Sequence, residues 1–424
     1  MGTTVVLVTR DLRVHDNPAL AGACASAEHV VPLFVVDPSL PADPRRRAFL
    51  AGSLVDMREA LRERGGDLLV RHGDPVAQAM EVCGEVGATG LVVAEDVSGY
   101  AGRRQRRLAG ACRVARVSFT LTPGVTVVPP AALHPYRVFT PYWRAWRAAR
   151  WRAPVPAPAR VTLPPGVRGD DPARILDVPV AGVPRGGENA GRRRLREWSR
   201  RVGGYGADRD ALADDATSRL SPYLHFGCVS PLAVVSMVDG AEEFVRQVCW
   251  RDFYHQVLAS FPALTSTAYR PGTVEKWRND PAALDAWRTG HTGLPIVDAG
   301  MRQLAAEGWL PNRARLITAG YLTKVLGLDW RDGADWYARS LVDADVANNW
   351  GNWQWVAGTG NDPRPYRRIN PIRQGHRFDP DGRYVRRWVP ELAGIAGGAV
   401  HELWRLPRRP AGYPPPLEHP EQRW

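Results

Sequence analysis

The sequence lacks the paired cysteines that metal centres and disulfide frameworks use. Its five cysteines are scattered and none forms a C-x-x-C pair. We therefore expect no metal site and no disulfide framework, and no cysteine-ligated iron–sulfur cluster after Cys249, the last cysteine. No apolar run approaches the ~20 residues that span a membrane, and the start of the chain resembles a strand rather than a signal peptide. The sequence predicts a reduced, soluble, cytoplasmic protein without membrane contact, and we expect a monomer.

Lysine is almost absent, because Lys276 and Lys324 are the only lysines among 56 basic residues. A composition rich in Ala, Gly, Pro and Arg accounts for the choice of arginine over lysine. The net charge of +12 is a separate observation. Such an excess favours a polyanionic partner, nucleic acid first, over a basic surface that is merely solvated.

Tryptophan is missing from the first 142 residues, although the chain contains 16. Five of them lie close together near the end of the chain: Trp330, Trp336, Trp350, Trp353 and Trp355. Indole rings are bulky and each buried N–H needs a partner, so ordinary core packing rarely needs such a cluster. The clustering indicates rings that stack on a flat ligand or pass electrons, and it places the chemistry in the C-terminal half.

Residues 1–128 alternate short apolar runs with helical patterns. The runs cover residues 5–9, 30–37, 68–72, 90–95 and 114–121, and helical patterns such as 47–64 and 75–86 lie between them. This alternation predicts an α/β domain with a doubly wound parallel sheet. The first run is followed by RDLRVHDN rather than a glycine-rich fingerprint, so a nicotinamide-binding fold is not expected.

The remaining chain is predicted to form a linker and an all-α domain. Residues 129–187 are the expected interdomain linker, since 152–186 are rich in Pro, Gly and Ala. Residues 188–424 form the expected helical domain, with helical patterns at 189–201, 231–238, 242–261, 281–288, 295–307, 311–326 and 330–341. The tail beyond residue 362 contains many prolines and arginines, and we expect it to be irregular.

Four segments of the helical half contain more polar and aromatic side chains than packing requires: residues 205–227, 247–254, 309–316 and 329–361. The first precedes a helix start and suits a phosphate, although a helix cap explains it more simply. In the second segment, aromatic rings at helical spacing are typical of a hydrophobic core. In the third, a solvated helix face competes with contacts to phosphate or flavin.

In order and spacing these segments resemble the photolyase/cryptochrome family, most of all the bacterial class I cyclobutane pyrimidine dimer photolyases. The most specific matches are residues 217–221, 250–254, 293–302 and 349–360. The resemblance covers nearly the whole chain. It implies a helical domain that binds FAD and UV-damaged DNA. It also implies a deoxyribodipyrimidine photo-lyase, a carbon–carbon lyase that uses light to split cyclobutane dimers in a flipped-out lesion.

The resemblance also implies which residues contact FAD: Tyr205, Thr217, Ser218, Arg219, Leu220, Ser221, Arg251, Arg315, Asp343, Asp345 and Asn349. Residues 217–221 match the segment that holds the pyrophosphate. Arg315 and Asp343 match an ion pair against the isoalloxazine ring, and Asn349 matches a side chain that faces a flavin nitrogen. A buried anionic flavin needs such cations and polar groups, because an unpaired buried charge is costly.

Three tryptophans match the family's electron-transfer chain, namely Trp353 next to the flavin, Trp330 in the middle and Trp277 at the surface. We expect Trp287 and Trp309 to be structural. The residues that match contacts to the lesion or its flanking phosphates are Arg209, Gln247, Trp250, Asn312, Arg313 and Trp355. The basic balance of the chain suits such a partner, because phosphate contacts dominate affinity for DNA.

The match fails at a few positions of the substrate cavity. Gln247 replaces a glutamate of most dimer photolyases, and an amide donates hydrogen bonds but supplies no proton. Gln is also found in (6-4) photolyases and animal cryptochromes, but their catalytic histidine has no counterpart here, where Pro311 and Leu316 stand. Leu316 itself replaces a usual Met, and Asp252 a commoner Glu. Dimer repair is favoured; the alternatives are a cryptochrome-like blue-light receptor with little repair, a (6-4) photolyase, or a non-catalytic damage binder. The short tail after Trp404 favours the enzyme over the receptor.

The N-terminal domain is expected to hold an antenna chromophore, either 8-hydroxy-5-deazaflavin or methenyltetrahydrofolate. Arg46, Asp96, Tyr100, Arg103 and Arg104 are the candidate lining of its cleft, at the strand ends where such sheets bind ligands. An arginine-rich helix face explains the same residues equally well.

Overall fold

The computed structural model describes residues 2–40, 43–172, 183–273, 275–362, 364–365 and 367–418. The chain forms two compact units. The first unit comprises Met1–Val202 and Ser218–Pro262, and the second comprises Gly203–Thr217 and Ala263–Trp424. Residues 173–182 of the expected linker lie outside the described residues. The proposed domain boundaries at residues 128 and 187 stay predictions.

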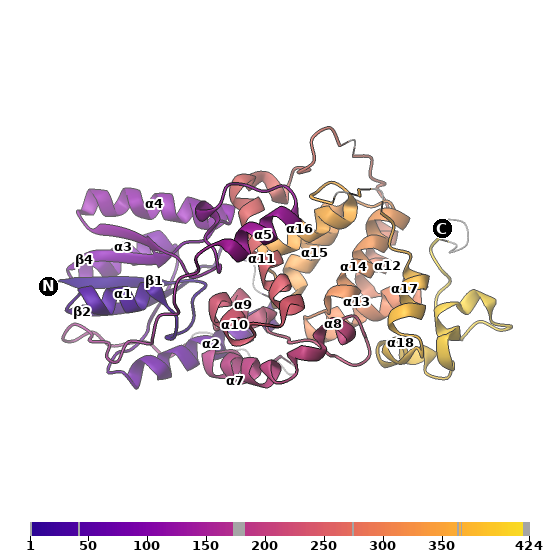
Figure 1. Cartoon of the computed structure of the whole chain (residues 1–424), viewed down its shortest axis with the longest axis horizontal. Helices are drawn as coiled ribbons and strands as arrows, with labels where there is room; N and C mark the ends of the chain where they lie inside the picture. Colours follow the sequence, from indigo (N-terminus) through magenta and orange to yellow (C-terminus); the bar gives the residue numbers. More distant parts are fainter. Residues whose placement is uncertain are drawn as a thin grey trace. The chain divides into compact units, whose positions relative to one another are not determined.

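The first unit begins with a five-stranded parallel sheet (Figure 1). Its strands are β1 (Thr3–Val8), β2 (His29–Val36), β3 (Leu69–His72), β4 (Ala88–Ala94) and β5 (Ser118–Thr122), in the order β3-β2-β1-β4-β5. In register, Val5 of β1 lies opposite Val31 of β2 and Leu91 of β4. The strand order reverses between β1 and β4, so their carboxyl ends flank the crevice where doubly wound sheets bind ligands.

Four helices connect these strands: α1 (Pro18–Ser26), α2 (Pro44–Arg62), α3 (Pro75–Glu85) and α4 (Gly99–Ala115). The first three begin with proline directly after Asn17, Asp43 and Asp74, whose side chains accept backbone N–H groups of the first turn. Helices α3 and α4 pack on each other and on the sheet (Figure 1). Their Val82 and Leu108 join the strands in one apolar cluster.

The apolar run 114–121 is a strand only in its second half, so the prediction of a strand across the whole run is wrong. Helix α4 continues to Ala115, and Arg116 ends it in the left-handed conformation with φ +58°. Val114 is 85% exposed on that helix, so its apolar side chain does not mark a buried strand. The strand β5 begins at Ser118.

The first unit also contains α11 (Glu242–Ser260) and the shorter helices η1 (Pro130–Ala132), α5 (Phe139–Ala148), α7 (Glu188–Ser199), α9 (Ser221–His225) and α10 (Pro231–Met237). Of these, η1, α5 and α10 pack on α11. Asp252 of α11 is fully buried and holds neighbouring segments in place. One of its oxygens accepts the backbone N–H groups of Val127 and Val128 and the indole N–H of Trp146. Burial raises the pKa of Asp252 in spite of these bonds.

The second unit is helical. Its longer elements are α12 (Pro281–Thr289), α13 (Pro295–Glu307), α14 (Asn312–Gly320), α15 (Trp330–Ser340) and α16 (Val346–Ala357), with the short α8 (Tyr205–Asp208). Helix α14 continues into a π-helical turn, η4 (Tyr321–Val325). Large side chains such as Trp287, Trp330 and Trp353 fill its core. The predicted α/β-then-helical fold class is confirmed.

The described part of the tail beyond residue 362 contains helices, so the prediction of an irregular tail is wrong. It contains α17 (Pro371–Phe378), α18 (Arg383–Trp388) and the short turns η5 (Pro390–Leu392), η6 (Gly397–His401) and η7 (Leu403–Arg405). Asn370 caps α17 by accepting the N–H of Arg373, and Pro371 occupies its first turn. Asp379 accepts the first N–H groups of α18. Prolines and polar residues therefore start helices in this segment rather than prevent them.

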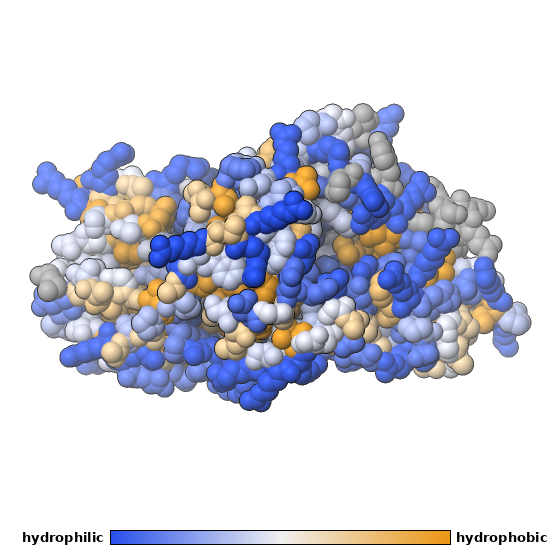
Figure 2. Space-filling model, viewed as in Figure 1, coloured by the Kyte–Doolittle hydropathy of each residue, from blue (hydrophilic) through white to orange (hydrophobic). Residues whose placement is uncertain are grey.

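The visible surface is mainly hydrophilic, and its apolar residues form small separate patches (Figure 2). The helices of the described residues include none that is long and apolar enough to cross a bilayer. The five cysteines have free thiols.

Candidate functional site

The segment expected to hold a pyrophosphate has an unusual backbone. Arg219 adopts the left-handed conformation with φ +49°, which costs a residue other than glycine about 1–3 kcal/mol and is retained where the local structure requires it. The hydroxyl of Ser218 accepts the N–H of Leu220 at 3.3 Å, and its carbonyl accepts Nε of Arg194 at 2.8 Å. A left-handed residue beside right-handed ones turns neighbouring backbone N–H groups to the same side, a geometry that suits an anion. The segment therefore fits a phosphate.

Thr217, which belongs to the second unit, adds a related observation. Its hydroxyl oxygen is buried and has no hydrogen-bond partner among the described residues. A buried polar atom without a partner is destabilising, so this atom is suited to a ligand.

Arg315 and Asp343 form an ion pair in the second unit. Nη2 of Arg315 lies 3.0 and 2.8 Å from the two oxygens of Asp343, and its Nε donates to the carbonyl of Leu310 at 3.0 Å. The Asp343 side chain is only 1% exposed, whereas that of Arg315 is 26% exposed. The guanidinium is thus fixed in direction, and part of it stays open to a neighbouring anionic or polar group.

Helix α16 positions two further candidate FAD contacts. Asp345 caps the helix, since its Oδ1 accepts the backbone N–H and the Nδ2 of Asn348 at 2.9 and 2.8 Å. One turn later, Asn349 donates from Nδ2 to the carbonyl of Ala334 on α15 at 2.8 Å. This bond fixes the orientation of the amide, so a ligand N–H placed here would meet Oδ1, the acceptor of the amide.

Trp353 lies on the same helix and packs against α15. It is 2% exposed, and a Cβ added to Gly333 would lie 2.2 Å from its ring. Tyr337 and Trp287 surround the indole edge-to-face at 5.1 and 6.0 Å. Trp330 is fully buried one helical turn before Gly333. The structure therefore places two of the three predicted electron-transfer rings in one core.

Trp277, the third ring, is half-buried and shares a partner with Trp330. Nε1 of Trp277 donates to Oε2 of Glu275 at 2.9 Å, and Nε1 of Trp330 donates to the same oxygen at 3.2 Å. Glu275 was not a candidate from the sequence. Its proximity to Trp277 in the chain was visible, but its contact with Trp330 depends on the fold.

The predicted lesion contacts of the first unit lie on α11. Gln247 and Trp250 are both half-buried, one turn apart. One face of Trp250 is covered by the ring of Phe139, stacked at 3.7 Å and 5°. Arg251 is buried and donates to the carbonyl of Val125 at 2.6 Å. The structure thus brings Gln247 and Trp250 to one face of α11.

The predicted lesion contacts of the second unit differ in how strongly they are engaged. Trp355 is half-buried, and the guanidinium of Arg367 lies 5.2 Å from its ring centroid. Arg313 donates to both oxygens of Asp210, at 3.2 and 2.7 Å, so it is held within the unit. Asn312 is exposed at the start of α14.

Arg209 lies close to Tyr205, the candidate FAD contact on α8. Its guanidinium is 5.8 Å from the centroid of the tyrosine ring. Arg209, Tyr205 and the Arg315–Asp343 pair belong to the second unit, whereas residues 218–221, Gln247, Trp250 and Arg251 belong to the first. A common site formed by the two sets stays a prediction.

Two of the candidate antenna residues take part in contacts at the carboxyl ends of the strands. Arg10 follows β1 and pairs with Asp96, which follows β4, at 3.3 Å. Tyr100, in the first turn of α4, donates from its hydroxyl to Asp37 after β2. Burial and this bond raise the pKa of Tyr100 to about 12.

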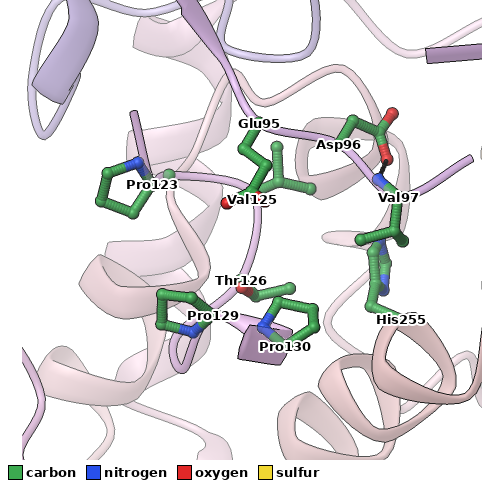
Figure 3. Close-up of a pocket in the computed structure, with 10 residues that line it drawn as sticks. Glu95, Asp96, Val97, Pro123, Val125, Thr126, Pro129, Pro130 and His255 are labelled. Carbon is green, nitrogen blue, oxygen red and sulfur yellow. Dashed lines mark hydrogen bonds between the residues drawn. The ribbon is translucent and has the colours of Figure 1, made fainter. Parts of the chain in front are cut away.

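The arginines expected to line the chromophore cleft differ in exposure and in their contacts. Arg104 lies 5.5 Å from the Tyr100 ring centroid, Arg103 is exposed, and Arg46 is half-buried on α2. Figure 3 shows a small hollow beyond β4 and β5, where Asp96 stands beside segments 123–126 and 129–130 and His255 of α11. The expected chromophore site and this hollow thus share Asp96.

Comparison with known proteins identifies both halves of the chain. Residues 4–159 match the family model of DNA photolyase, and residues 244–422 match that of the FAD binding domain of DNA photolyase. A deoxyribodipyrimidine photo-lyase of Streptomyces griseus is 46% identical over 98% of this chain and 96% of its own. A cryptochrome DASH of Gloeobacter violaceus is 36% identical over 96% of this chain and 89% of its own.

Solved structures show the same relationship. A bacterial class III photolyase from Agrobacterium tumefaciens superimposes with a TM-score of 0.93 at 32% identity, over 100% of this chain and 96% of that one. An archaeal photolyase from Sulfolobus tokodaii, determined with two FAD molecules, gives 0.91 at 30% identity over 99% and 97%.

The chain belongs to the photolyase/cryptochrome family. Its cofactor is FAD, and the prediction of an enzyme of the photo-lyase class is confirmed by full-length relatives. The turned backbone at Arg219, the oriented Arg315–Asp343 pair and the Oδ1 of Asn349 suit an anionic, hydrogen-bonding cofactor of this kind. The residue assignments themselves stay predictions.

Proposed function

We propose that the protein repairs cyclobutane pyrimidine dimers in UV-damaged DNA in a light-dependent reaction. The main support for this proposal is the difference in exposure between two indoles on α16. Trp353 is 2% exposed and packs against α15. Trp355, two residues later and therefore on nearly the opposite side of the helix, is half-buried beneath Arg367. One helix thus offers an inner ring suited to electron transfer and an outer ring suited to stacking.

In this proposal the half-buried residues Trp355 of α16 and Gln247 and Trp250 of α11 receive the lesion. Trp355 and Trp250 stack on the flipped pyrimidines, since stacking on aromatic rings tolerates any base. Phe139 covers one face of Trp250, and the proposal assigns the other face to the lesion. Gln247, one turn away, hydrogen-bonds the dimer through its amide. Full-length relatives named deoxyribodipyrimidine photo-lyase support this substrate.

The inner residues hold and orient FAD. Bound FAD supplies light-driven transfer of one electron. Residues 217–221 bind its pyrophosphate, and Arg315 with Asp343 neutralises and orients its ring system. Asn349 offers Oδ1, the acceptor of its amide, to a ring N–H, and the bond from Nδ2 to the carbonyl of Ala334 holds the amide in that orientation. Trp353, Trp330 and Trp277 carry electrons inward from the surface.

A cryptochrome-like photoreceptor with little repair is the second candidate. Gln247 favours it, because the amide cannot supply the proton that a carboxylic acid would. The likeness to a cryptochrome DASH at 36% identity supports it as well. The segment 309–316, which lacks a histidine, argues against (6-4) repair.

The decisive experiment is blue-light turnover by the flavin-reduced protein on two DNA oligomers. One oligomer contains a thymine cyclobutane dimer and the other a (6-4) photoproduct. We expect thymine to be restored from the first oligomer alone. Repair of neither, with FAD bound and photoreducible, would overturn the proposal in favour of the photoreceptor. Repair of the second alone would identify a (6-4) photolyase.

A further inference from the structure

One carboxylate, that of Glu275, connects Trp330 and Trp277, the middle and surface rings of the predicted electron-transfer chain. Oε2 of Glu275 accepts the indole N–H of Trp277 at 2.9 Å and that of Trp330 at 3.2 Å. Indole has a single donor, so both rings direct their only polar atom to the same oxygen. Trp330 is fully buried and Trp277 is half-buried. The bridge therefore extends from the core of the second unit to its surface.

Arg331 completes this arrangement. Its two terminal nitrogens lie 2.8 and 3.0 Å from the two oxygens of Glu275, and its guanidinium carbon lies 4.6 Å from the ring centroid of Trp330. Asp329 accepts from the same guanidinium at 3.0 Å and also caps α15. Burial alone would raise the pKa of Glu275, but the bonds from Arg331, Trp277 and Trp330 outweigh it and lower this pKa. Glu275 is therefore ionised at neutral pH.

The two charges act differently on the two rings. A carboxylate at the indole N–H stabilises positive charge on the ring, and Glu275 does so for both tryptophans. A guanidinium stacked on the ring opposes positive charge, and Arg331 is stacked on Trp330. The favourable and unfavourable effects oppose each other at Trp330, whereas Trp277, whose indole N–H bonds the same carboxylate, has no guanidinium stacked on its ring among the described residues.

We propose that Glu275 and Arg331 direct oxidation outward to Trp277, and that Glu275 accepts the indole proton of the oxidised ring. The inference depends on the proposed electron-transfer role of Trp353, Trp330 and Trp277. An electron passes from Trp277 to oxidised Trp330, which has already reduced Trp353, the donor to photoexcited FAD. The N–H bond of Trp277 then breaks, its electron pair stays on the indole nitrogen, and the proton binds Oε2 of Glu275. An external thiol later returns one electron, and the proton goes back to the indole.

The first test follows tryptophan radicals by transient absorption in the FAD-bound protein, where protonated and deprotonated radicals have different spectra. In Glu275→Gln we expect the deprotonated radical to form about tenfold more slowly or in lower yield, because an amide is a very weak base. Glu275→Asp, which keeps the charge, should recover part of the effect. An unchanged rate and yield of the deprotonated radical in Glu275→Gln would overturn the proposal.

Arg331→Gln provides a second variant that leaves Glu275 intact. Without the stacked cation, positive charge should stay longer on Trp330, and the yield at Trp277 should fall. An unchanged distribution between the two rings would contradict the role of Arg331.

A dark measurement tests the bridge independently of photochemistry. The indole N–H resonances of Trp277 and Trp330, assigned by single Trp→Phe variants of the FAD-bound protein, should both shift in Glu275→Gln. A shift of neither resonance would show that the bridge is absent.

Trp353→Phe separates the two proposals: if it leaves photoreduction unchanged, the electron-transfer chain itself fails. If it abolishes photoreduction while Glu275→Gln has no effect on the radicals, only the role of Glu275 fails.

Discussion

Gln247 is the residue on which the proposed repair depends most directly. It lies half-buried on α11, one turn before Trp250. Among the described residues its Nε2 makes a single long hydrogen bond, of 3.4 Å, to the carbonyl of Glu243. Its amide is therefore weakly held and available to a ligand. It offers a neutral donor where a carboxyl group would offer a proton.

We expect Gln247→Glu to raise the quantum yield of cyclobutane dimer repair severalfold, equivalent to about 1 kcal/mol from a stronger hydrogen bond to the dimer radical. The measurement is thymine restored per absorbed photon in the flavin-reduced protein. Gln247→Leu, which removes hydrogen bonding at the same position, should lower the yield. Repair that is unchanged or lost in Gln247→Glu would show that this position does not limit the reaction.

Substitutions of Trp353 and Trp287 form a matched pair, because both rings are buried and their centroids lie 6.0 Å apart. We expect Trp353→Phe to slow flavin photoreduction more than about tenfold, or ~1.4 kcal/mol in the barrier, with FAD still bound. Trp287→Phe should leave photoreduction unchanged. It should lower the free energy of unfolding by about 1–3 kcal/mol, because the carbonyl of Thr318 loses its indole donor. Equal photoreduction rates in the two variants would remove Trp353 from the chain.

At the scale of helices, α15 can hold Trp353 only because one of its residues has no side chain. A Cβ at Gly333 would lie 2.2 Å from the Trp353 ring and 2.6 Å from Leu322. Alanine normally stabilises a helix interior by about 1 kcal/mol relative to glycine. Overlap with a buried ring reverses that preference.

We expect Gly333→Ala to lower the free energy of unfolding by about 1–3 kcal/mol and to slow photoreduction, because Trp353 must move. Chemical denaturation and photoreduction kinetics measure the two effects. Gly110→Ala on α4 is the control, because its added Cβ would meet nothing within 4 Å apart from its chain neighbours and the nearby backbone of its own helix, and it should stabilise by about 0.5–1 kcal/mol. If both variants stabilise the protein, the packing of Trp353 on α15 is wrong.

The sequence predicted most elements because their signals are local. Buried β-type runs predicted the sheet, and Pro-started helices such as α12 and α13 lie where expected. The tail was misjudged because its prolines follow capping residues such as Asn370 and therefore begin helices. At the site, Glu275 could not be predicted, since its second indole partner is 55 residues away in the chain. Similarly, only the fold shows that Arg313 is held by Asp210.

At the scale of the whole molecule, the net charge of +12 predicts how binding depends on salt. Each phosphate neutralised by an arginine releases counterions, so the logarithm of the affinity falls with the logarithm of salt at a slope of about −0.9 per phosphate contact. A solvated basic surface without a DNA partner would show no such contact-specific slope. A single arginine near the proposed lesion site therefore tests the origin of the charge.

Arg367 is that residue, because its guanidinium lies over the outer ring of Trp355 and it is exposed. We expect Arg367→Gln to weaken binding of dimer-containing DNA and to reduce the salt slope by about 1. Arg113→Gln is the control, since it removes the same charge from an exposed position on α4 of the first unit. Fluorescence anisotropy from low to moderate salt measures both slopes. If the two variants change the slope equally, affinity reflects total charge, and Arg367 contacts no phosphate. A change confined to Arg367→Gln places a phosphate beside Trp355.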